Sequence, residues 1–484
     1  MNGRPTIFVS PYRNVSIRYI IYSDIFKELL KQDIRIIVFV KDGDLEYYRD
    51  RLSSENVIVE PVFFDAALRN DRANRFIRMS VLARQFISGS APGYKNSSDH
   101  IQVLNFHDAW SGTFVSRLHW YAIRLIATLA NRSSKIRKAL VALESKMAPG
   151  HLYDSYFERY KPQMLVVSSL GYMIDPQMMR AAKRHETRVV SIVHGWDNPT
   201  TKAYRGAEPD YAIAWNDTMR QEISVFHDIP DDRVHVGGVA HWDFYFNGSF
   251  KPGPRSDFLK RNGLSNDRSV IFYAMPGYVM YRHSFDIIER VLHAIESSEI
   301  KAPSQLLARF HPIYMLPNRN GEGQVIDKFR ERIESIEQRF GHLIRFVEPA
   351  VTKLRDDVDQ PVEDQHGLAE SLYHSDVMLT EYSTTILEAA ICDLPVVNIS
   401  LYEFAGTDVS ASLNNDFTHI KRILDTGALQ TASTEAQVIE FINYYLEDRS
   451  RDRENRQKLV DSIVDHNRGV AGQDIGKYIY GLLR

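Results

Sequence analysis

The sequence lacks the features that would place it in several large classes of protein. Cysteine occurs once among its 484 residues, at Cys392, which excludes an intrachain disulfide and a zinc site built from several cysteines. No apolar stretch approaches the roughly 20 residues of a membrane-spanning helix. The apolar run at residues 7–9 is too short for the core of a secretion signal. We therefore expect a cytoplasmic protein.

Charge and glycine motifs exclude further classes. The formal net charge is −3, so the chain has no overall basic field of the kind that marks a dedicated nucleic-acid-binding protein. We expect no nucleic-acid partner. The sequence contains no GxxxxGK[ST] motif, and no GxGxxG motif follows its first apolar run. These absences argue against a P-loop nucleotide hydrolase and against a typical dinucleotide-dependent enzyme.

What the sequence does contain is an alternation of short apolar runs and amphipathic segments. A chain of 484 residues is too long for one ordinary domain core. Its first half has apolar runs at residues 7–9, 34–40, 164–167, 189–193, 211–214 and 234–236, and amphipathic segments at 19–31 and 176–185. Strands that alternate with helices predict βαβ units and a parallel sheet.

The alternation restarts after residues 251–255, a segment rich in proline and glycine that we interpret as a linker. Further strands are predicted at residues 270–274, 305–310, 343–347, 377–380 and 395–399. We therefore predict an α/β protein with two Rossmann-like domains, residues 1–245 and 255–484. The glycines at 237 and 238 and the Trp242–Asp243 pair come just before the linker, and we expect them to shape a hinge.

Residues 69–146 depart from this alternation and carry 13 Lys and Arg against four Asp and Glu. They include Trp110, Trp120 and Tyr121 and a predicted helix at 125–143. Four cations cluster in that helix: Arg132, Lys135, Arg137 and Lys138. A basic amphipathic helix with aromatic residues can lie on an anionic membrane surface. The alternative is a helical insertion that packs on the first domain and exposes a solvated basic face.

The most informative motif is residues 376–390. A strand ends near Thr380, a turn contributes Ser383, Thr384 and Thr385, and a helix begins near Thr385. Free N–H groups at a helix start attract phosphate, and hydroxyl groups add donors there. Glu388, one turn later, could accept hydrogen bonds from ribose hydroxyls. The alternative needs no ligand, because Thr385-x-x-Glu388 also fits a capping box.

Two further predicted strands end at a histidine. Residues 305–310 bring Arg309 and His311 to a carboxyl end, where open α/β sheets bind ligands. Residues 189–193 lead to His194, which is suited to proton transfer at neutral pH, and Gly195 allows a substrate to approach closely. A surface histidine at a turn and a structural βα turn are the respective alternatives. The acidic residues between 356 and 364 lack calcium-loop spacing, and we interpret them as a solvated loop.

Together these residues resemble the GT-B glycosyltransferase superfamily, and most closely CDP-glycerol glycerophosphotransferase-like enzymes and bacterial surface-polysaccharide transferases. The resemblance rests on three short motifs within residues 160–400: His194-Gly195 with Thr201-Lys202, His311-Pro312, and residues 380–384. Glu381 stands where the glycerophosphotransferases have aspartate, and Trp196 interrupts their usual motif. Residues 386–390 are more similar to enzymes that use sugar nucleotides. These departures favour a sugar donor over CDP-glycerol.

The resemblance implies two parallel sheets that face a central cleft and a glycosyltransferase that needs neither a metal ion nor another cofactor. Its partners would be a nucleotide-sugar donor and a glycan or lipid-linked acceptor. The basic segment adds the expectation of peripheral contact at the inner face of the plasma membrane. The second domain would bind the donor through Arg309, His311, Ser383, Thr384, Thr385 and Glu388. The first domain would bind the acceptor through Gly195 and Lys202, with His194 as the catalytic base.

Three alternatives remain open from the sequence. A CDP-glycerol-type glycerophosphotransferase would use a related donor. An isomerase similar to UDP-GlcNAc 2-epimerase shares the architecture but needs no second substrate. A non-catalytic partner in a polysaccharide assembly complex would keep the fold without turnover.

Overall fold

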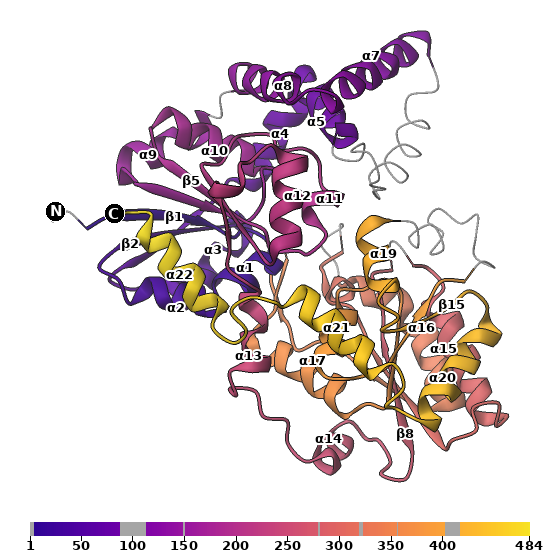
Figure 1. The fold of residues 1–484 in the computed structure, drawn as a ribbon. Coiled ribbons are helices and arrows are strands. Elements are labelled where there is room, and N and C mark those ends of the chain that lie inside the picture. The colour runs from indigo at the N-terminus through magenta and orange to yellow at the C-terminus, as the bar shows by residue number, and fades with distance from the viewer. Residues whose placement is uncertain are drawn as a thin grey trace. The chain divides into compact units, whose positions relative to one another are not determined.

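A computed structural model describes residues 4–87, 113–148, 151–278, 281–318, 323–355, 357–401 and 417–484 (Figure 1). The chain divides into two compact units. Unit 1 comprises Met1–Asp243 and Val464–Arg484, and unit 2 comprises Phe244–Ile463. Each unit contains its own parallel sheet, as the sequence predicts for an α/β protein.

The sheet of unit 1 has seven strands in the order β3-β2-β1-β4-β5-β6-β7. Every neighbouring pair runs parallel. The strands are β1 (Thr6–Ser10), β2 (Arg35–Val40), β3 (Val57–Pro61), β4 (Met164–Val167), β5 (Arg188–Ile192), β6 (Tyr211–Ala214) and β7 (Val234–Val236). The central strands are continuous apolar runs because helices cover both faces of a parallel sheet. Phe8 on β1 packs edge-on against Phe39 of β2, with ring centroids 4.9 Å apart.

Helices connect these strands and leave polar residues at the carboxyl ends. They are α1 (Asn14–Ile20), α2 (Asp24–Leu30), α3 (Leu45–Leu52), α9 (Asp154–Tyr160), α10 (Asp175–Arg184), α11 (Asn198–Thr201) and α12 (Asp217–His227), with short 3-10 turns η1 (Asp42–Asp44), η2 (His151–Tyr153), η3 (Asp231–Arg233) and η4 (Ala240–Trp242). The segment 19–31, predicted as one helix, is divided between α1 and α2. Ser23 causes the break because its hydroxyl accepts a hydrogen bond from the backbone N–H of Ile25 and caps α2.

A helical insertion follows β3, as expected. It consists of α4 (Phe64–Ala73), α5 (Arg75–Ile87), α7 (Phe114–Asn131) and α8 (Ser134–Met147), which Figure 1 shows in purple. Trp110 lies outside the described residues. The predicted single helix at 125–143 is wrong, since the chain turns between α7 and α8. Arg137 bridges that turn and donates to the carbonyls of Ala130 and Asn131.

A buried charge cluster joins the insertion to the rest of unit 1. The carboxylate of Glu144 on α8 is 1% exposed and accepts hydrogen bonds from Ser80 and Arg84 of α5 and from Arg180 of α10. Arg137 also pairs with Asp228, which follows α12, at 2.6 Å. Some of the predicted basic face is therefore structural, since these guanidinium groups neutralise buried or half-buried carboxylates.

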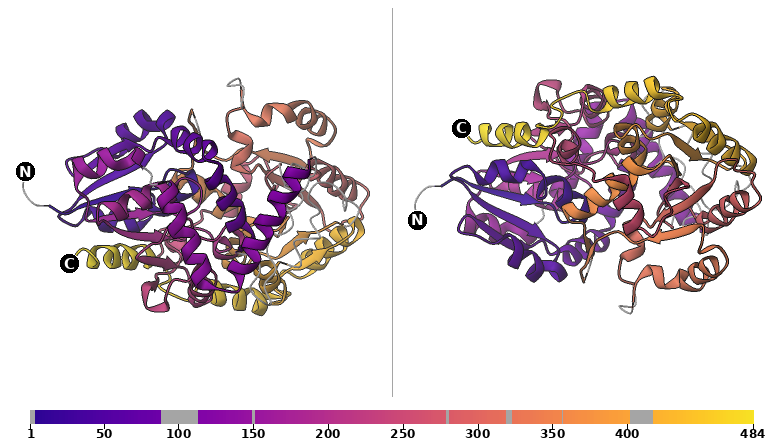
Figure 2. Two further views of the ribbon diagram at one scale, coloured as in Figure 1. Left: turned by 90° about the horizontal axis from the view of Figure 1, so that it is seen from above. Right: turned by 90° about the horizontal axis from the view of Figure 1, so that it is seen from below.

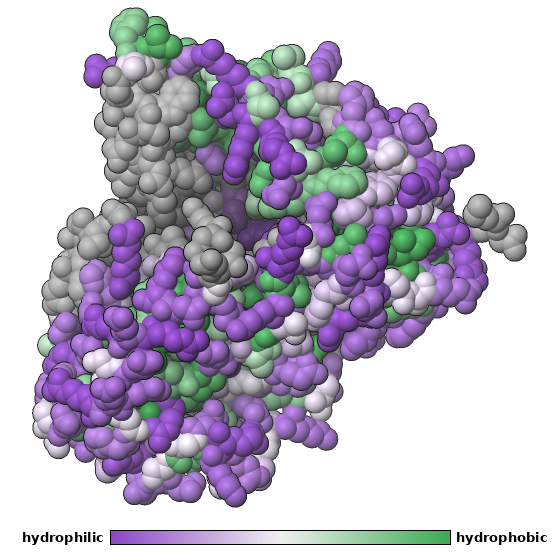
Figure 3. Space-filling model, turned by 180° about the vertical axis from the view of Figure 1, so that it is seen from behind, coloured by the Kyte–Doolittle hydropathy of each residue, from purple (hydrophilic) through white to green (hydrophobic). Residues whose placement is uncertain are grey.

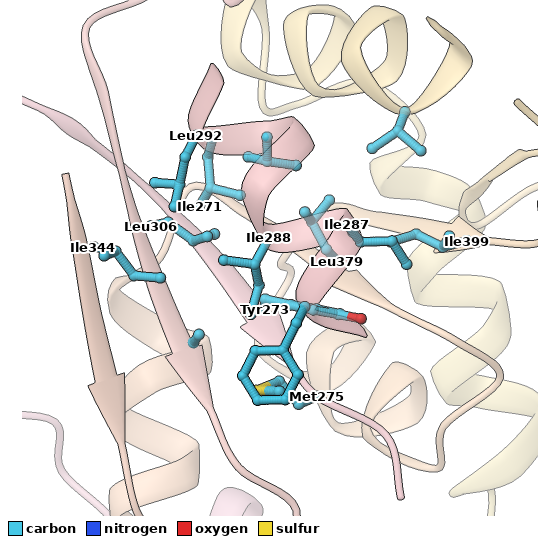
Figure 4. Packing of buried hydrophobic residues seen from close by; sticks show 14 of the residues in the cluster. Ile271, Tyr273, Met275, Ile287, Ile288, Leu292, Leu306, Ile344, Leu379 and Ile399 are labelled. Carbon is cyan, nitrogen blue, oxygen red and sulfur yellow. The ribbon is translucent and has the colours of Figure 1, made fainter. Parts of the chain in front are cut away.

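The main sheet of unit 2 has six strands in the order β10-β9-β8-β13-β14-β15, all parallel. They are β8 (Ser269–Ala274), β9 (Ser304–Arg309), β10 (Ile344–Val347), β13 (Val377–Thr380), β14 (Val396–Ile399) and β15 (Gln430–Ala432), and β11 (Thr352–Lys353) and β12 (Val358–Asp359) form a small antiparallel pair. Ile271, Leu306 and Leu379, from three neighbouring strands, pack with Ile288 and Leu292 of the covering helix α15 (Ser284–Glu296), as Figure 4 shows. This cluster is the core that fixes the carboxyl ends of the strands.

The remaining elements are α13 (Asp243–Phe246), α14 (Arg255–Arg261), α15 (Ser284–Glu296), η5 (Pro312–Met315), η6 (Val325–Phe329), α16 (Arg330–Phe340), α17 (Val362–His374), α18 (Thr385–Ile391), α19 (Thr418–Leu424), α20 (Glu435–Glu447) and α21 (Arg453–Ile463). The interpretation of residues 356–364 as a solvated loop is wrong for two of its acids. Asp359 on β12 is fully buried, and Asp364 on α17 is 4% exposed.

The last helix, α22 (Ala471–Gly481), belongs to unit 1 and lies beside α2 (Figures 1 and 2). The sequence-based boundaries, 1–245 and 255–484, therefore differ from the structure at the end of the chain. Small residues allow this packing, since a Cβ atom at Gly472 would lie 2.9 Å from the backbone nitrogen of Ile25. Asp243 holds the start of α22 by accepting from the N–H groups of Ala471 and Gly472.

The glycines expected to shape a hinge also pack against this terminal segment. A Cβ atom at Gly237 would lie 2.3 Å from the side chain of Ile475, and one at Gly238 would lie 2.6 Å from the carbonyl oxygen of His466. Gly238 has a φ of +91°, a conformation that only glycine adopts easily. Their contacts in unit 1 account for both glycines without a hinge.

Candidate active site

Unit 1 gathers polar residues at the carboxyl ends of three adjacent strands, β1, β4 and β5. Arg13 follows β1, Ser168 follows β4, and His194 follows β5. Parallel strands end at the same sheet edge, which is where ligands bind in open α/β sheets. The sequence predicted His194 at this edge, whereas Arg13 and Ser168 were missed because no motif marks them.

His194 is held in one orientation and is 7% exposed. Its Nδ1 donates a hydrogen bond to the carbonyl oxygen of Ser168. This bond places the lone pair of the neutral ring on Nε2, the atom that a general base uses. Burial, together with the smaller effects of the nearby charges of Arg13 and Lys202, lowers the pKa of His194 to about 4, so the ring is neutral at pH 7.

Tyr172 links the two cations beside His194. Arg13 donates to the Tyr172 hydroxyl at 3.2 Å, and the Lys202 ammonium lies 5.9 Å from the centre of the Tyr172 ring. Lys202 is thus brought near His194, as the predicted motif requires. Tyr172 was not predicted.

Gly195 and Asn198 lie close together next to His194. A Cβ atom at position 195 would lie 2.8 Å from the Asn198 side-chain oxygen, so a larger residue would displace that amide. Asn198 is 7% exposed, and its Nδ2 has no hydrogen-bond partner among the described residues. A buried donor of this kind is a candidate for contact with a ligand oxygen.

A second buried histidine, His241, was also missed by the sequence analysis. It follows β7 in η4 and packs against Tyr19, with ring centroids 4.9 Å apart. Burial lowers its pKa well below the ordinary value, and the charge of Arg18 adds to this. His241 is therefore neutral, and its electrostatic interaction with His194 places it near that ring.

In unit 2, hydrogen bonds to neighbouring strands hold the turn after β13. Glu381 is 3% exposed and accepts a hydrogen bond from the Tyr273 hydroxyl at 2.7 Å. Burial raises the pKa of Glu381 to about 8. Tyr382 adopts a φ of +44° and donates its backbone N–H to Asn398 at 2.9 Å. These contacts fix the turn that presents the following hydroxyl residues.

The hydroxyl-rich segment leads directly into α18, as predicted. Ser383 accepts from the backbone N–H of Thr385 at 3.2 Å and donates to the Thr385 hydroxyl at 3.0 Å. The helix begins at Thr385, and its N-cap Thr384 is exposed and makes no side-chain capping hydrogen bond. The capping-box alternative therefore places the helix start one residue too late, because Thr385 is the first helical residue rather than the cap.

Glu388 is half-buried on the first turn of α18, and its Oε1 accepts a hydrogen bond from the Tyr245 hydroxyl at 3.1 Å. Tyr245 stacks on Phe244, with ring centroids 4.2 Å apart. No local pattern predicts this contact, since 143 residues separate Tyr245 from Glu388. The hydroxyl fixes the direction of the Glu388 carboxylate.

Arg309 and His311 differ in their surroundings. Arg309 is 9% exposed and pairs with Asp364 of α17 at 2.5 Å, so its charge is balanced within the protein. His311 is exposed beyond the end of β9, and its Nδ1 accepts from the backbone N–H of Ile313 at 3.1 Å. This bond leaves the proton of the neutral ring on Nε2. The geometry favours His311 over Arg309 as a group that meets a ligand.

One trio in the described part of the chain could share a metal ion: Asp217, Asp465 and His466. His466 already contacts Asp465 at 2.7 Å, and all three residues are exposed or half-buried. We assign them no role.

Comparison with solved structures finds whole-chain similarity. The chain is similar to a glycosyltransferase from Rickettsia africae, with 10% identity, a TM-score of 0.50 and coverage of 100% of this chain and 99% of that one. A UDP-N-acetylglucosamine 2-epimerase gives 14% identity, a TM-score of 0.50 and coverage of 100% and 97%. The chain is also similar to Arabidopsis thaliana UGT89C1 in complex with UDP-L-rhamnose, with 11% identity, a TM-score of 0.50 and coverage of 100% of this chain and 100% of that one.

No protein-family model and no curated protein matches the chain. At these low sequence identities, the similarity to solved structures shows the fold and nothing about activity. Two parallel α/β sheets in two units, with helices around each, agree with that comparison. The chain therefore has the GT-B fold that the resemblance implied.

Proposed function

We propose that this protein is a glycosyltransferase that moves a sugar from a nucleotide-activated donor to an acceptor hydroxyl. The observation that carries the proposal is the orientation of His194, whose Nδ1 is bound to Ser168 so that Nε2 can accept a proton. A different set of groups, hydroxyls and a carboxylate, stands at the sheet edge of unit 2. Two sites of different chemistry suit a reaction with two substrates.

In this proposal unit 2 binds the donor. The N–H groups and hydroxyls of Ser383, Thr384 and Thr385 bind the diphosphate, and Glu388 accepts hydrogen bonds from the ribose. Tyr245 supports that role because it orients the Glu388 carboxylate. His311 lies toward the leaving diphosphate. Arg309 acts mainly through Asp364, holding α17 to the end of β9.

The proposed reaction is a displacement at the anomeric carbon. Nε2 of His194 takes the proton of the acceptor hydroxyl while its oxygen bonds to the anomeric carbon. The bond from that carbon to the phosphate oxygen breaks, and the electron pair leaves with the nucleoside diphosphate. Hydrogen bonds from the start of α18 and from His311 stabilise the charge that develops on the leaving group. These roles draw on no metal ion.

The main alternative is an isomerase, because a UDP-N-acetylglucosamine 2-epimerase is among the similar structures. An epimerase converts its sugar nucleotide without an acceptor. Incubation of the purified protein with UDP, CDP, GDP and dTDP sugars, with and without acceptor, separates the two by product. Conversion without any acceptor would contradict the transferase.

The acceptor is expected to be a surface glycan or a lipid-linked sugar, with α7 in contact with an anionic membrane surface. No helix in the described ranges is long and apolar enough to cross a bilayer. However, α7 exposes a row of apolar side chains at helical spacing: Phe114, Leu118, Tyr121, Leu125 and Leu129. Figure 3 shows apolar side chains gathered at the end of this helix, at the upper left. The opposite face, with Ile123 and Ala127, is buried against α5 and α8 of the same insertion.

Cations accompany that apolar row. Arg117, Arg124 and Arg132 are exposed on or just after α7, and the helix contains no acidic residue. An apolar stripe flanked by cations fits the boundary between anionic headgroups and acyl chains. This surface supports peripheral attachment beside a lipid-linked acceptor.

The test of donor binding is the Glu388→Ala variant. A nucleotide at about 100 times its dissociation constant stabilises a protein by about 2.7 kcal/mol, so a thermal-shift screen against nucleotides and nucleotide sugars identifies the base. Glu388→Ala should weaken binding of the best ligand by about 10- to 100-fold, the effect of losing hydrogen bonds to a charged group. Glu447→Ala, at an exposed glutamate on α20, is the control. Normal nucleotide binding by Glu388→Ala would contradict the assignment.

A further inference from the structure

Two cations near His194 have no carboxylate partner within the described ranges. Arg13 is half-buried and contacts the Tyr172 hydroxyl, and Lys202 lies over the ring of the same tyrosine. Most other buried or half-buried cations of unit 1 are paired, as Arg84 and Arg180 are with Glu144. The charges of Arg13 and Lys202 are therefore available to a ligand.

The acids nearby do not balance these charges. Asp175 is 1% exposed and accepts from the Ser169 hydroxyl, and burial raises its pKa to about 7. Asp197 accepts from the Thr201 hydroxyl at 2.7 Å. Neither forms an ion pair with Arg13 or Lys202. Positive charge thus remains at the edge of the sheet where His194 lies.

An uncharged hydrogen-bond donor, the side-chain amide of Asn198, also lies near His194. The buried Nδ2 of Asn198 has no partner in the part of the chain that the structure describes, and it lies against Gly195, next to the histidine. A ligand oxygen bound there would satisfy this group.

We propose that the acceptor is anionic, and that Arg13 and Lys202 bind a phosphate or carboxylate next to the hydroxyl that His194 deprotonates. This inference rests on the proposed function, since it assumes that unit 1 holds the acceptor. It adds the chemical class of that acceptor, which no motif in the sequence specified.

An anion at this position would also change the basicity of His194. The charged and titratable groups that face the ring are Arg13 at the start of α1, Asp197 and Lys202 on either side of α11, and His241 in η4. Arg13 and Lys202 lower the pKa of His194, so an anion that offsets them moves this pKa back toward its ordinary value. The base would then strengthen when the acceptor binds.

Calorimetric titration of the full chain, without donor, tests the proposal. The probes are glucose 6-phosphate, glucuronate and glucose, which offer a phosphate, a carboxylate and no charge. At least one anionic sugar should bind about 10-fold or more tightly than glucose, and which one binds better identifies the anion. Arg13→Gln and Lys202→Gln should each lose about 10-fold or more of that affinity. Arg159→Gln, at an exposed arginine of unit 1, should lose none.

Several outcomes would overturn the proposal: binding of glucose as tight as that of the anions, binding of none of the three, or equal losses in Arg159→Gln. Arg13→Lys keeps the charge and should restore most of the affinity, which separates charge from misfolding. UDP binding should be unchanged in Arg13→Gln. If it falls as it does in Glu388→Ala, the cations serve the donor and the acceptor assignment is wrong. Binding of anionic sugars without glycosyl transfer would support the anion site and contradict the glycosyltransferase.

Discussion

His194 and His311 occupy contrasting environments, and the contrast predicts different roles. His194 is buried, neutral and oriented by Ser168, as a base for the acceptor requires. His311 is exposed at the end of β9, in the unit that carries the hydroxyl-rich turn. The same residue type at the end of a strand therefore serves each substrate differently in our proposal.

His194→Ala should lower kcat by about 10²- to 10⁴-fold, the usual contribution of a positioned base. The donor dissociation constant should change little, because His194 belongs to unit 1. His311→Ala should raise that constant as well as lower kcat. Steady-state kinetics and donor titration of both variants check this. Near-normal turnover of His194→Ala, or a loss of donor binding in that variant alone, would show that the roles are misassigned.

Glu381 predicts a pH dependence of stability. Its pKa is about 8 in the folded protein and near 4.5 in an unfolded chain, so the folded state retains a proton that the unfolded state releases between these values. Its stabilising contribution is complete below pH 4.5 and is lost as the pH rises to 8. Glu381→Gln removes this loss and keeps an acceptor for Tyr273.

We therefore expect Glu381→Gln to stabilise unit 2 by about 2–5 kcal/mol at pH 9 and to have little effect at pH 4.5. Denaturant unfolding across this pH range measures the difference. Glu447→Gln, at an exposed position, should follow the wild-type curve throughout. If the difference between Glu381→Gln and wild type is constant with pH, the carboxyl group is not protonated in the folded protein.

At the scale of elements, α7 is the part of the insertion that packing does not explain. Its inner face is buried, yet Phe114 is 77% exposed and Leu125 60% exposed on the outer side. The sequence indicated a basic segment here, but it could not separate Arg137, which pairs with Asp228, from the exposed cations. Which cations are paired and which are exposed depends on how α8 packs against α5.

Wild-type protein should co-sediment with vesicles that contain anionic lipid and not with neutral vesicles. Leu118→Ser with Leu125→Ser should reduce binding by about 10-fold or more, because two leucine side chains are lost from the exposed apolar face that is proposed to enter the membrane surface. Binding should also weaken with salt, since exposed charges are screened. Ile58→Ser, at an exposed apolar position on β3, is the control. Equal binding to anionic and neutral vesicles would exclude the electrostatic part of the surface.

For the whole molecule, the chain's return to unit 1 depends on small residues in α22. Gly472→Ala should destabilise the protein by about 1–3 kcal/mol despite the better helix propensity of alanine, because its Cβ would press on the α2 backbone. Gly481→Ala, on the same helix with nothing within 4 Å, should be neutral or slightly stabilising. Thermal unfolding compares the two. Equal melting temperatures would mean that α22 does not pack closely on α2.

The sequence by itself determined the α/β class, most of the strands, the strand ends that His194 and His311 follow, and the strand end at Thr380. These follow from local properties, since apolar runs and turn residues act over a few positions. The edge strands β3 and β15 were missed. β15 (Gln430–Ala432) contains one apolar residue and so forms no apolar run, whereas β3 does contain the run Val57-Ile58-Val59.

Only the tertiary structure decided which residues meet at those strand ends. Arg13, Tyr172 and Ser168 join His194, and Tyr245 joins Glu388, because strands distant in sequence are neighbours in the sheet and helices return over it. The same holds for α22, whose fit against α2 depends on the absence of side chains at two glycines. Such contacts are set by packing between distant segments, and no local pattern records them.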